Sequence, residues 1–248
     1  MEVLAGLAIN AAVGAVPAPE GIQRCRQLLD AVRGNLRAEG FVVTYLAQLY
    51  CHVGDFGLAR ETSRRGRAIV KRSGAMVWSE ALAVEAADIE RLAGDPVTAE
   101  REVRSVLQQL QLQEDEGLAP MLGTALAQAL YEQGRYGEAL ELAGDALASA
   151  EGLSRTAALG VWAKTLARLG RPEEALGAAR EVADRAGRTD YVVLRAEALI
   201  DAAEALLLAG HAQEAQPVLR EARRLAEAKG SVVLTQRSQQ LTDGDLDP

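Results

Sequence analysis

Apolar and polar residues along this chain follow the pattern of helices and not that of strands. β-Branched residues occur in short clusters such as Ile69-Val70 and Val192-Val193, without the alternation that a half-buried strand shows. Elsewhere Ala, Leu, Glu and Arg dominate, and these are the strongest helix formers. The pattern therefore predicts an all-α chain. Its many alanines also predict helices that approach one another closely.

One arrangement of glycine and alanine, the Ala–Gly–Ala frame, recurs five times. Its glycines are spaced by 40, 40, 36 and 40 residues: Gly54, Gly94, Gly134, Gly170 and Gly210. One alanine stands seven residues before each glycine and another stands five residues after it, as in Ala87-x6-Gly94-x4-Ala99. Repetition at such a period is typical of solenoid proteins.

Each position of the frame has a physical reason. The glycine suits the end of the first helix of a pair, where left-handed backbone is needed. Asp, or Arg171 followed by Pro172, often comes next and is suited to opening the second helix. The alanines suit close helix crossings, which a larger side chain would push apart. We expect the second helices to stop at Gly74, Gly152, Gly187 and Gly230.

The frames predict one right-handed α-solenoid domain over residues 1–240, with about five and a half helix pairs. We expect the pairs at about 1–34, 35–74, 75–115, 116–153, 154–190 and 191–230, a solvating end helix at 231–241 and an acidic tail at 242–248. The helix before Gly14 is apolar, whereas a first repeat normally has a polar outer face. This start suits either a piece of a longer repeat region or a short helix folded onto the next pair.

The Ala–Gly–Ala frame resembles the tetratricopeptide repeat, with a longer period than the usual 34 or so residues. Residues 5–235 are similar to the helical C-terminal region of large actinobacterial regulators, in which a cyclase-like or transcription-regulator region and a STAND-type ATPase precede such repeats. The resemblance rests on VPAPEGIQRCRQLL, LAGDPVTAEREVRSVLQQL, ALAQALYEQGRYGEAL and LRAEALIDAAEALLLAGHAQEA. No cyclase or ATPase motif is present, so neither activity is implied.

Charge and cysteine content narrow the function classes. The net charge is −8, divided as +4 over residues 1–74 and −12 over residues 75–248, and this disfavours nucleic acid as a partner. Cys25 and Cys51 form no disulfide framework, which favours a reducing cytoplasm. No run of apolar residues is long enough to span a membrane. The apolar start resembles a signal peptide, but it contains Glu2 and no preceding Lys or Arg.

No catalytic motif stands out in the chain. It has no phosphate-binding loop, no dinucleotide fingerprint and no zinc or serine-hydrolase signature. His52 is next to Cys51 on a helix, so the two side chains diverge, and His211 is expected in an exposed turn. Glu114, Asp115 and Glu116 read as a solvated turn. We expect no enzyme activity, metal or cofactor.

The resemblance implies a binding groove, because the first helices of tetratricopeptide pairs line the concave side. Positions thirteen, ten, six, three or two residues before the frame glycines should face it. The candidates are Gln48, His52, Asp88, Arg91, Gln128, Tyr131, Lys164 and Arg168, together with Thr44, Cys51 and Glu204. A purely structural helix face can also be polar in this way.

A second candidate surface is basic. Arg60, Arg64, Arg67 and Lys71 follow a 4-3-4 spacing that puts them on one stripe of a helix, the basic stripe. Such a stripe is usually a solvated face. Its alternative role is contact with an acidic partner, such as the acidic half of another copy.

These patterns together favour a non-catalytic module that binds a protein or peptide in the groove. The partner could also be an attached ATPase or cyclase domain, or another copy of the chain. The alternative is a small-molecule or signalling-peptide sensor of a transcription regulator. An open polar groove would favour the module, and closure around an apolar cavity would favour the sensor.

Overall fold

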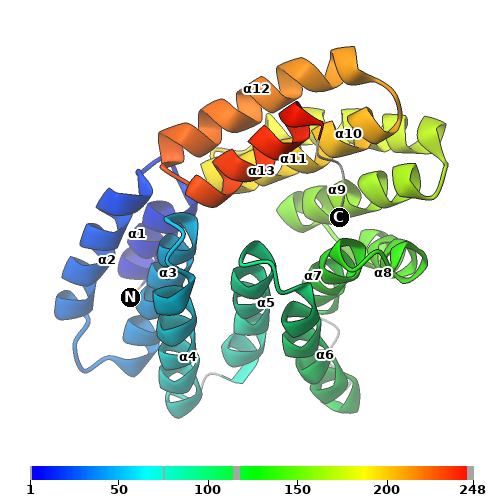
Figure 1. Cartoon of the computed structure of the whole chain (residues 1–248). Helices are drawn as coiled ribbons and strands as arrows, with labels where there is room; N and C mark the ends of the chain where they lie inside the picture. Colours follow the sequence, from blue (N-terminus) through cyan, green and yellow to red (C-terminus); the bar gives the residue numbers. More distant parts are fainter. Residues whose placement is uncertain (1, 75, 114–117, 245–248) are drawn as a thin grey trace.

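The computed structural model describes residues 2–74, 76–113 and 118–244. These residues form thirteen α-helices and no strand (Figure 1). The helices are α1 (Glu2–Val13), α2 (Ala18–Ala31), α3 (Leu36–His52), α4 (Phe56–Arg72), α5 (Met76–Leu92), α6 (Pro96–Gln113), α7 (Ala119–Glu132), α8 (Tyr136–Ser149), α9 (Gly152–Arg168), α10 (Pro172–Ala186), α11 (Val192–Leu208), α12 (Ala212–Lys229) and α13 (Val232–Asp243). The fold is an all-α solenoid of paired helices, as the sequence predicts.

The frame glycines separate the two helices of a pair, as expected. All five have positive φ, from 73° at Gly170 to 84° at Gly94 and Gly210, a conformation that favours a residue without Cβ. The Asp that follows two of them caps the next helix: the side chain of Asp55 accepts from the backbone N–H of Leu58 at 3.0 Å, and Asp95 from that of Thr98 at 2.9 Å.

Not all of the glycines that were predicted to end the second helices do so. Gly74 and Gly230 have positive φ at 75° and 68°, and each follows the end of a helix. Gly187 closes α10 with an ordinary φ of −64°. Gly152 is wrong as a stop: α8 ends earlier, at Ser149, and Gly152 is the first residue of α9.

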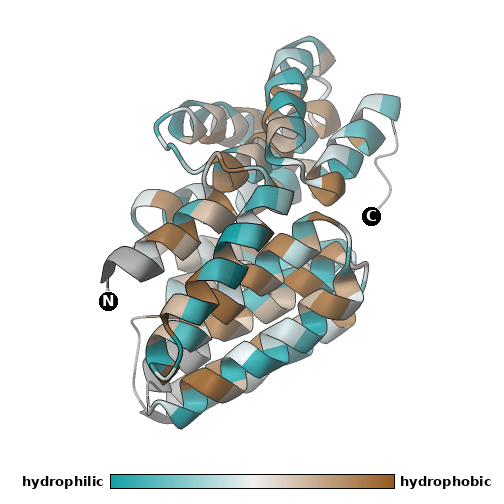
Figure 2. Ribbon diagram, turned by 90° about the vertical axis from the view of Figure 1, so that its left-hand side faces the viewer, coloured by the Kyte–Doolittle hydropathy of each residue, from teal (hydrophilic) through white to brown (hydrophobic). Residues whose placement is uncertain are grey.

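The frame alanines lie at helix crossings. All ten are at most 2% exposed, among them Ala127 and Ala163 at 0%. They pack with larger apolar side chains such as Leu130, Leu166 and Ile200, which are also fully buried. Hydrophobic and hydrophilic residues alternate along the ribbon of each helix, because one side packs and the other faces solvent (Figure 2).

Ion pairs join successive helix pairs. A carboxylate oxygen of Glu90 on α5 lies 2.7 Å from the guanidinium of Arg60 on α4, and Glu100 on α6 accepts from Arg135 before α8 at 2.9 Å. Further along the chain Arg180 of α10 donates to Glu214 of α12 at 2.8 Å. Each of these ion pairs links one helix pair to the next.

The solenoid curves until its last helices reach its first (Figure 1). Lys229, the last residue of α12, is fully buried, and its Nζ donates to the carbonyls of Ala11, Gly14 and Val16 at 2.8, 3.0 and 2.7 Å. Ser231, which caps α13, hydrogen-bonds Nδ1 of His52 at 3.0 Å. We call this contact between the end of α12 and the ends of α1 and α3 the closure.

The end helix is not merely solvating, contrary to the expectation from its sequence. Leu234, Ser238 and Leu241 of α13 are buried, and the helix packs on α12, α11 and α3. The predicted turn at Glu114–Glu116 and residues 245–248 of the acidic tail lie outside the described residues. Within the described part of the chain, no helix combines the length and the apolar run that crossing a bilayer requires.

Candidate functional site

Several of the predicted groove residues bind one another. The phenol of Tyr131 on α7 donates to the carboxylate of Glu204 on α11, and Nε of Arg168 on α9 donates to the phenol oxygen at 3.2 Å. Nζ of Lys164 donates to Asp201 at 2.8 Å and lies 4.5 Å from the centre of the Tyr131 ring. Burial raises the pKa of Tyr131, so its phenol stays a donor. This network joins α7, α9 and α11.

A second network joins α5 to α7. The guanidinium of Arg91 donates to Glu132 at 3.0 Å and to Asp88 at 3.3 Å, and Nε2 of Gln128 donates to Glu132 at 2.9 Å. The side chain of Arg91 is only 7% exposed. Most polar groups of these predicted groove residues thus already have partners within the chain.

His52 is part of the closure. It is 5% exposed, and burial lowers its pKa to about 4, so the imidazole is neutral at pH 7. Cys51 beside it is buried too, and burial raises the pKa of its thiol to about 12. Neither side chain is therefore suited to acid–base or nucleophilic chemistry.

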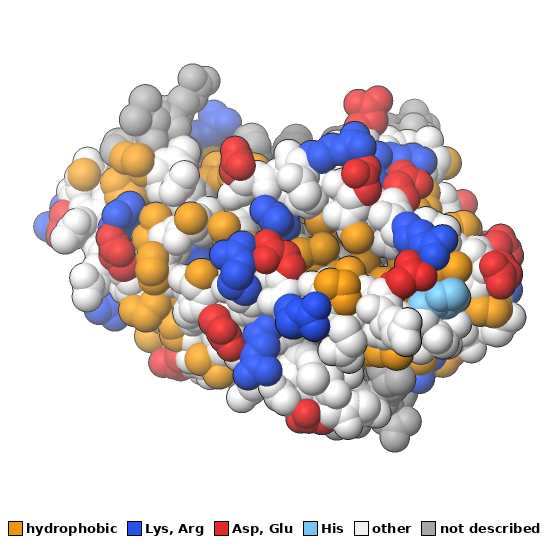
Figure 3. Space-filling view, turned by 90° about the horizontal axis from the view of Figure 1, so that it is seen from above, with side chains coloured by type: hydrophobic (Ala, Val, Ile, Leu, Met, Phe, Trp, Pro, Cys, Tyr) orange, Lys and Arg blue, Asp and Glu red, His pale blue; other side chains and the backbone are white. Residues whose placement is uncertain are grey.

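The basic stripe is largely neutralised. Arg60 binds Glu90 as described above, and Arg67 donates to Glu102 on α6 at 2.7 Å. Arg64 and Lys71 remain exposed. Figure 3 shows a different face, the side of α12, on which acidic and basic side chains are interspersed without a large area of one sign. Two of the four stripe residues thus join helix pairs, and Arg64 and Lys71 remain as exposed basic surface.

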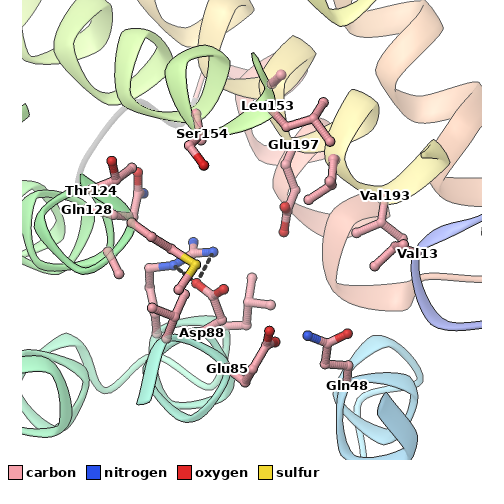
Figure 4. A pocket seen from close by; sticks show the side chains of 18 of the residues that line it. Val13, Gln48, Glu85, Asp88, Thr124, Gln128, Leu153, Ser154, Val193 and Glu197 are labelled. Atoms are coloured by element: carbon pink, nitrogen blue, oxygen red, sulfur yellow. Dashed lines mark hydrogen bonds and ion pairs between the residues drawn. The ribbon is translucent and has the colours of Figure 1, made fainter. Parts of the chain in front are cut away.

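A hollow of about 400 Å³, the central cavity, lies on the concave side (Figure 4). Helices α1, α3, α5, α7, α9 and α11 supply most of its wall, and α10 and α13 contribute one residue each. Val13 of α1, Val84 and Ile89 of α5, Val161 of α9 and Val193 of α11 supply apolar surface. Ser154 and Ala157 of α9 line the cavity and are exposed, so they lie where it opens to solvent.

Among the polar side chains that line the central cavity without a partner, three come from α3, α5 and α11. They are Gln48 of α3, Glu85 of α5 and Glu197 of α11, which face the same space in Figure 4. Among the described residues, no hydrogen bond or ion pair engages any of the three. All three are partly buried and have no partner within the described chain, so they are the polar groups of the wall that a ligand can bind.

The pKa values of the two carboxylates, Glu85 and Glu197, are raised by burial and by other carboxylates nearby. Burial, Asp88 and Glu197 raise the pKa of Glu85 to about 8. Burial and Asp88 likewise raise the pKa of Glu197 to about 7, and Arg91 opposes that rise. At pH 7 Glu197 is therefore about half-protonated and Glu85 is mostly protonated, and a positive charge placed between them would favour ionisation.

A second hollow of about 640 Å³ lies beneath α13. Tyr131, Lys164 and Glu204 line it, and so do Val233 and Leu241 of α13. Arg91 and Arg237 line both hollows and divide them. The end helix thus lies over part of the surface that the sequence predicted as the binding groove, which the sequence left either open or closed.

The arrangement suits binding better than catalysis. The central cavity brings together carboxylates, an amide and apolar walls, with no activated nucleophile beside a base. Among the described residues, no group of three or more His, Cys, Asp or Glu side chains could hold a metal ion.

Sequence reasoning missed part of this site. Gln48 was found, but Glu197 was not, although it stands thirteen residues before Gly210 and so satisfies the spacing used for the groove. Glu85 stands nine residues before Gly94, outside that spacing. Arg237 was also missed, because α13 has no frame and nothing in its sequence indicates that it turns back over the concave side.

Comparison with known proteins supports the fold. Residues 120–145 and 196–221, which cover most of α7–α8 and α11–α12, match the tetratricopeptide repeat family. No curated protein sequence matches the chain.

Two solved structures are similar over most of the chain. One is a putative kinesin light chain of Podosopora anserina with nearly identical TPR-like repeats, at 22% identity and a TM-score of 0.50, covering 74% of this chain and 92% of that one. The other is a Rap protein complexed with Competence and Sporulation Factor, at 13% identity and a TM-score of 0.65, covering 88% and 69%. At these identities the likeness concerns the fold alone: the chain is an all-α solenoid of tetratricopeptide-like helix pairs, two of which match the repeat family itself.

Proposed function

We propose that this chain is a binding module that takes a short peptide into its central cavity. The observation that carries the proposal is the convergence of Gln48, Glu85 and Glu197, all without partners, on one hollow with apolar walls. Its volume of about 400 Å³ is within the range of small-ligand sites, roughly 300–1,000 Å³. A few peptide residues suit this space better than a long protein segment does.

The concave side is poorly suited to a long partner. Tyr131, Lys164 and Arg91, which the sequence predicted as contacts, are held in networks within the chain. Helix α13 also lies over part of the groove. The closed arrangement therefore favours the sensor alternative over an open docking groove.

The comparisons add support of a general kind. A Rap protein of similar fold was solved in complex with Competence and Sporulation Factor. The fold is thus compatible with binding of a signalling factor, and we extend that role to this chain as a proposal. Control of an attached cyclase or STAND-ATPase region, which the sequence resemblance implies, remains a prediction. Both cysteines are unpaired and buried, which supports a location in a reducing cytoplasm.

A peptide-capture experiment tests the proposal. The purified chain is incubated with a pool of random tetrapeptide amides, and the retained peptides are identified by native mass spectrometry. We expect the wild type to retain a defined subset. Ala157→Trp should abolish retention, because the indole fills the cavity from an exposed position on α9.

The matched control is Ala148→Trp on α8, where the alanine is exposed and does not line the cavity. This variant should retain the same peptides as the wild type. Retention of the same subset by Ala157→Trp, or of none by the wild type, contradicts the proposal.

A further inference from the structure

We propose that the group recognised in the central cavity is a cation of the peptide, an ammonium or guanidinium held between the carboxylates of Glu85 and Glu197. This inference rests on the proposed function and names the chemistry of its ligand. It starts from the two carboxylates, which approach the same space from α5 and α11 and have no partner among the described residues (Figure 4).

The charges around the cavity leave a deficit of positive charge. Four carboxylates line it: Glu85, Asp88, Glu197 and Asp201. Asp88 binds Arg91 at 3.3 Å, and Asp201 binds Lys164 at 2.8 Å and Arg237 at 3.3 Å. Glu85 and Glu197 receive no such cation. When all four carboxylates are ionised, no ion pair among the described residues balances the charges of Glu85 and Glu197. A cation of the ligand would balance them.

His52 supplies an independent indication that a ligand belongs here. Its side chain is 95% buried and lines the cavity, and Nδ1 is bound to Oγ of Ser231 at 3.0 Å. That oxygen already accepts from the backbone N–H of Leu234 at 3.3 Å. The hydroxyl has no other acceptor among the described residues, so donation to Nδ1 satisfies it, and Nε2 then carries the hydrogen of the neutral ring.

This Nε2–H has no acceptor among the described residues, and His52 is one of the residues that line the cavity. We therefore include it in the proposal as a donor to the ligand. Together with the Gln48 amide it can bind a peptide carbonyl while the carboxylates bind the cation. The site offers both acceptors for a positive group and donors for the adjacent backbone.

Binding of a cation should release protons. The ionisable and charged groups facing the two glutamates are Tyr45, Cys51 and His52 of α3, Asp88 and Arg91 of α5, Asp201 of α11 and Arg237 of α13. Burial and then Asp88 raise the pKa of Glu85 to about 8 and that of Glu197 to about 7, and Arg91 and Arg237 oppose the rise at Glu197. Below these values the carboxyls are neutral and attract a cation weakly.

Affinity should therefore rise with pH. Where binding displaces one proton, the association constant increases by about tenfold per pH unit. We expect this slope between pH 5.5 and 7.5. A guanidinium ligand should keep its affinity at higher pH, whereas an N-terminal ammonium loses its own proton near pH 8 and should weaken again.

Two probe pools test the inference: random tetrapeptide amides with a free N-terminus, and the same pool N-acetylated. Retention of the free pool alone assigns the site to an N-terminal ammonium. Retention of acetylated peptides enriched in Lys or Arg assigns it to a side-chain cation. In either case Glu85→Gln and Glu197→Gln should each weaken retention at least tenfold and flatten the pH dependence. Glu61→Gln, at an exposed carboxylate on α4, is the control and should bind as the wild type does.

The outcome that contradicts this inference differs from the outcome that contradicts the proposed function. If neutral acetylated peptides bind the wild type and both glutamine variants equally, the cavity binds peptides but not through a cation. If the wild type retains no peptide from either pool, both proposals are overturned.

Circular dichroism melting checks that the variants fold. Removal of a crowded carboxylate should leave the melting temperature at pH 8 unchanged or higher, because the raised pKa values indicate that ionisation in the cavity is unfavourable.

Discussion

At the scale of single residues, glycine and alanine positions determine where the helices turn and how closely they cross. The five frame glycines adopt positive φ, and the ten frame alanines are buried at helix crossings. These positions were predictable because the reason for each is local: a left-handed turn excludes most side chains, and a close crossing excludes large ones.

The polar residues were less predictable at this scale. A spacing relative to a glycine indicates which side of a helix a residue occupies, but not whether another helix supplies its partner. Tyr131 and Glu197 both satisfy the groove spacing, yet Tyr131 binds Glu204 across 73 residues of sequence and Glu197 binds nothing described. Only the assembled structure separates the satisfied residue from the available one.

Enlarging a frame alanine tests the register of the repeat. Ala127 and Ala163 are 0% exposed, and a leucine at either site has no room without moving a helix. We expect Ala127→Leu and Ala163→Leu each to lower the free energy of unfolding by roughly 1–3 kcal/mol, measured by urea denaturation. Ala148→Leu, on the exposed side of α8, should change it by less than about 0.5 kcal/mol. Equal stability of all three variants would show that these crossings are looser than the structure indicates.

At the scale of elements, the repeat predicts the paired helices but does not predict how α13 packs. The segment SVVLTQRSQQL has few large apolar residues and no frame, so it was expected to solvate the last pair. In the structure Gly230, with φ of 68°, turns the chain sharply, and Ser231 caps α13 through Leu234. The helix then packs back over α11 and reaches α3, and its Arg237 enters the central cavity.

A pair of substitutions on α13 distinguishes a packed helix from a solvating one. Leu234 is 0% exposed and Val232, two residues earlier, is 47% exposed. We expect Leu234→Ala to lower the unfolding free energy by about 2–4 kcal/mol, because it leaves a cavity in the core. Val232→Ala should cost less than about 0.5 kcal/mol. If both variants unfold at the same urea concentration as the wild type, α13 does not contribute to the core.

At the scale of the whole molecule, curvature brings the two ends of the solenoid together. The closure joins residues far apart in sequence: His52 and Ser231 are 179 residues apart, and Lys229 and Ala11 are 218 apart. The curvature of a solenoid is the sum of small rotations from pair to pair, so a slight error at each crossing would separate its ends widely. For this reason the frame predicts a solenoid, but neither its closure nor the cavity that results.

Closure and ligand binding are expected to support each other. The central cavity is lined by α1 and α3 on one side of the closure and by α11 and α13 on the other. A ligand that contacts both sides binds the closed form more tightly than an open one. It therefore stabilises the closed form by the same free energy that closure adds to its affinity.

Lys229 offers the most direct test of the closure. Its Nζ donates to three carbonyls at and beyond the end of α1, within 3.0 Å, and has no carboxylate partner among the described residues. Lys229→Met keeps an unbranched side chain of similar length but removes all three hydrogen bonds and leaves carbonyls without a donor. We expect a loss of roughly 2–4 kcal/mol in the free energy of unfolding and a larger radius of gyration in small-angle X-ray scattering, because α1 and α2 separate from α12.

Lys71→Met is the control, since Lys71 is exposed on α4 and remote from the closure; it should leave both quantities unchanged. A Lys229→Met variant that loses stability but keeps the wild-type radius of gyration would mean that the lysine only caps α1, and that the Ser231–His52 contact and α13 are enough to hold the ends together. An increase in radius together with weaker retention of peptides would instead show that the closed solenoid is the form that binds, as expected if the cavity exists only while its two sides meet.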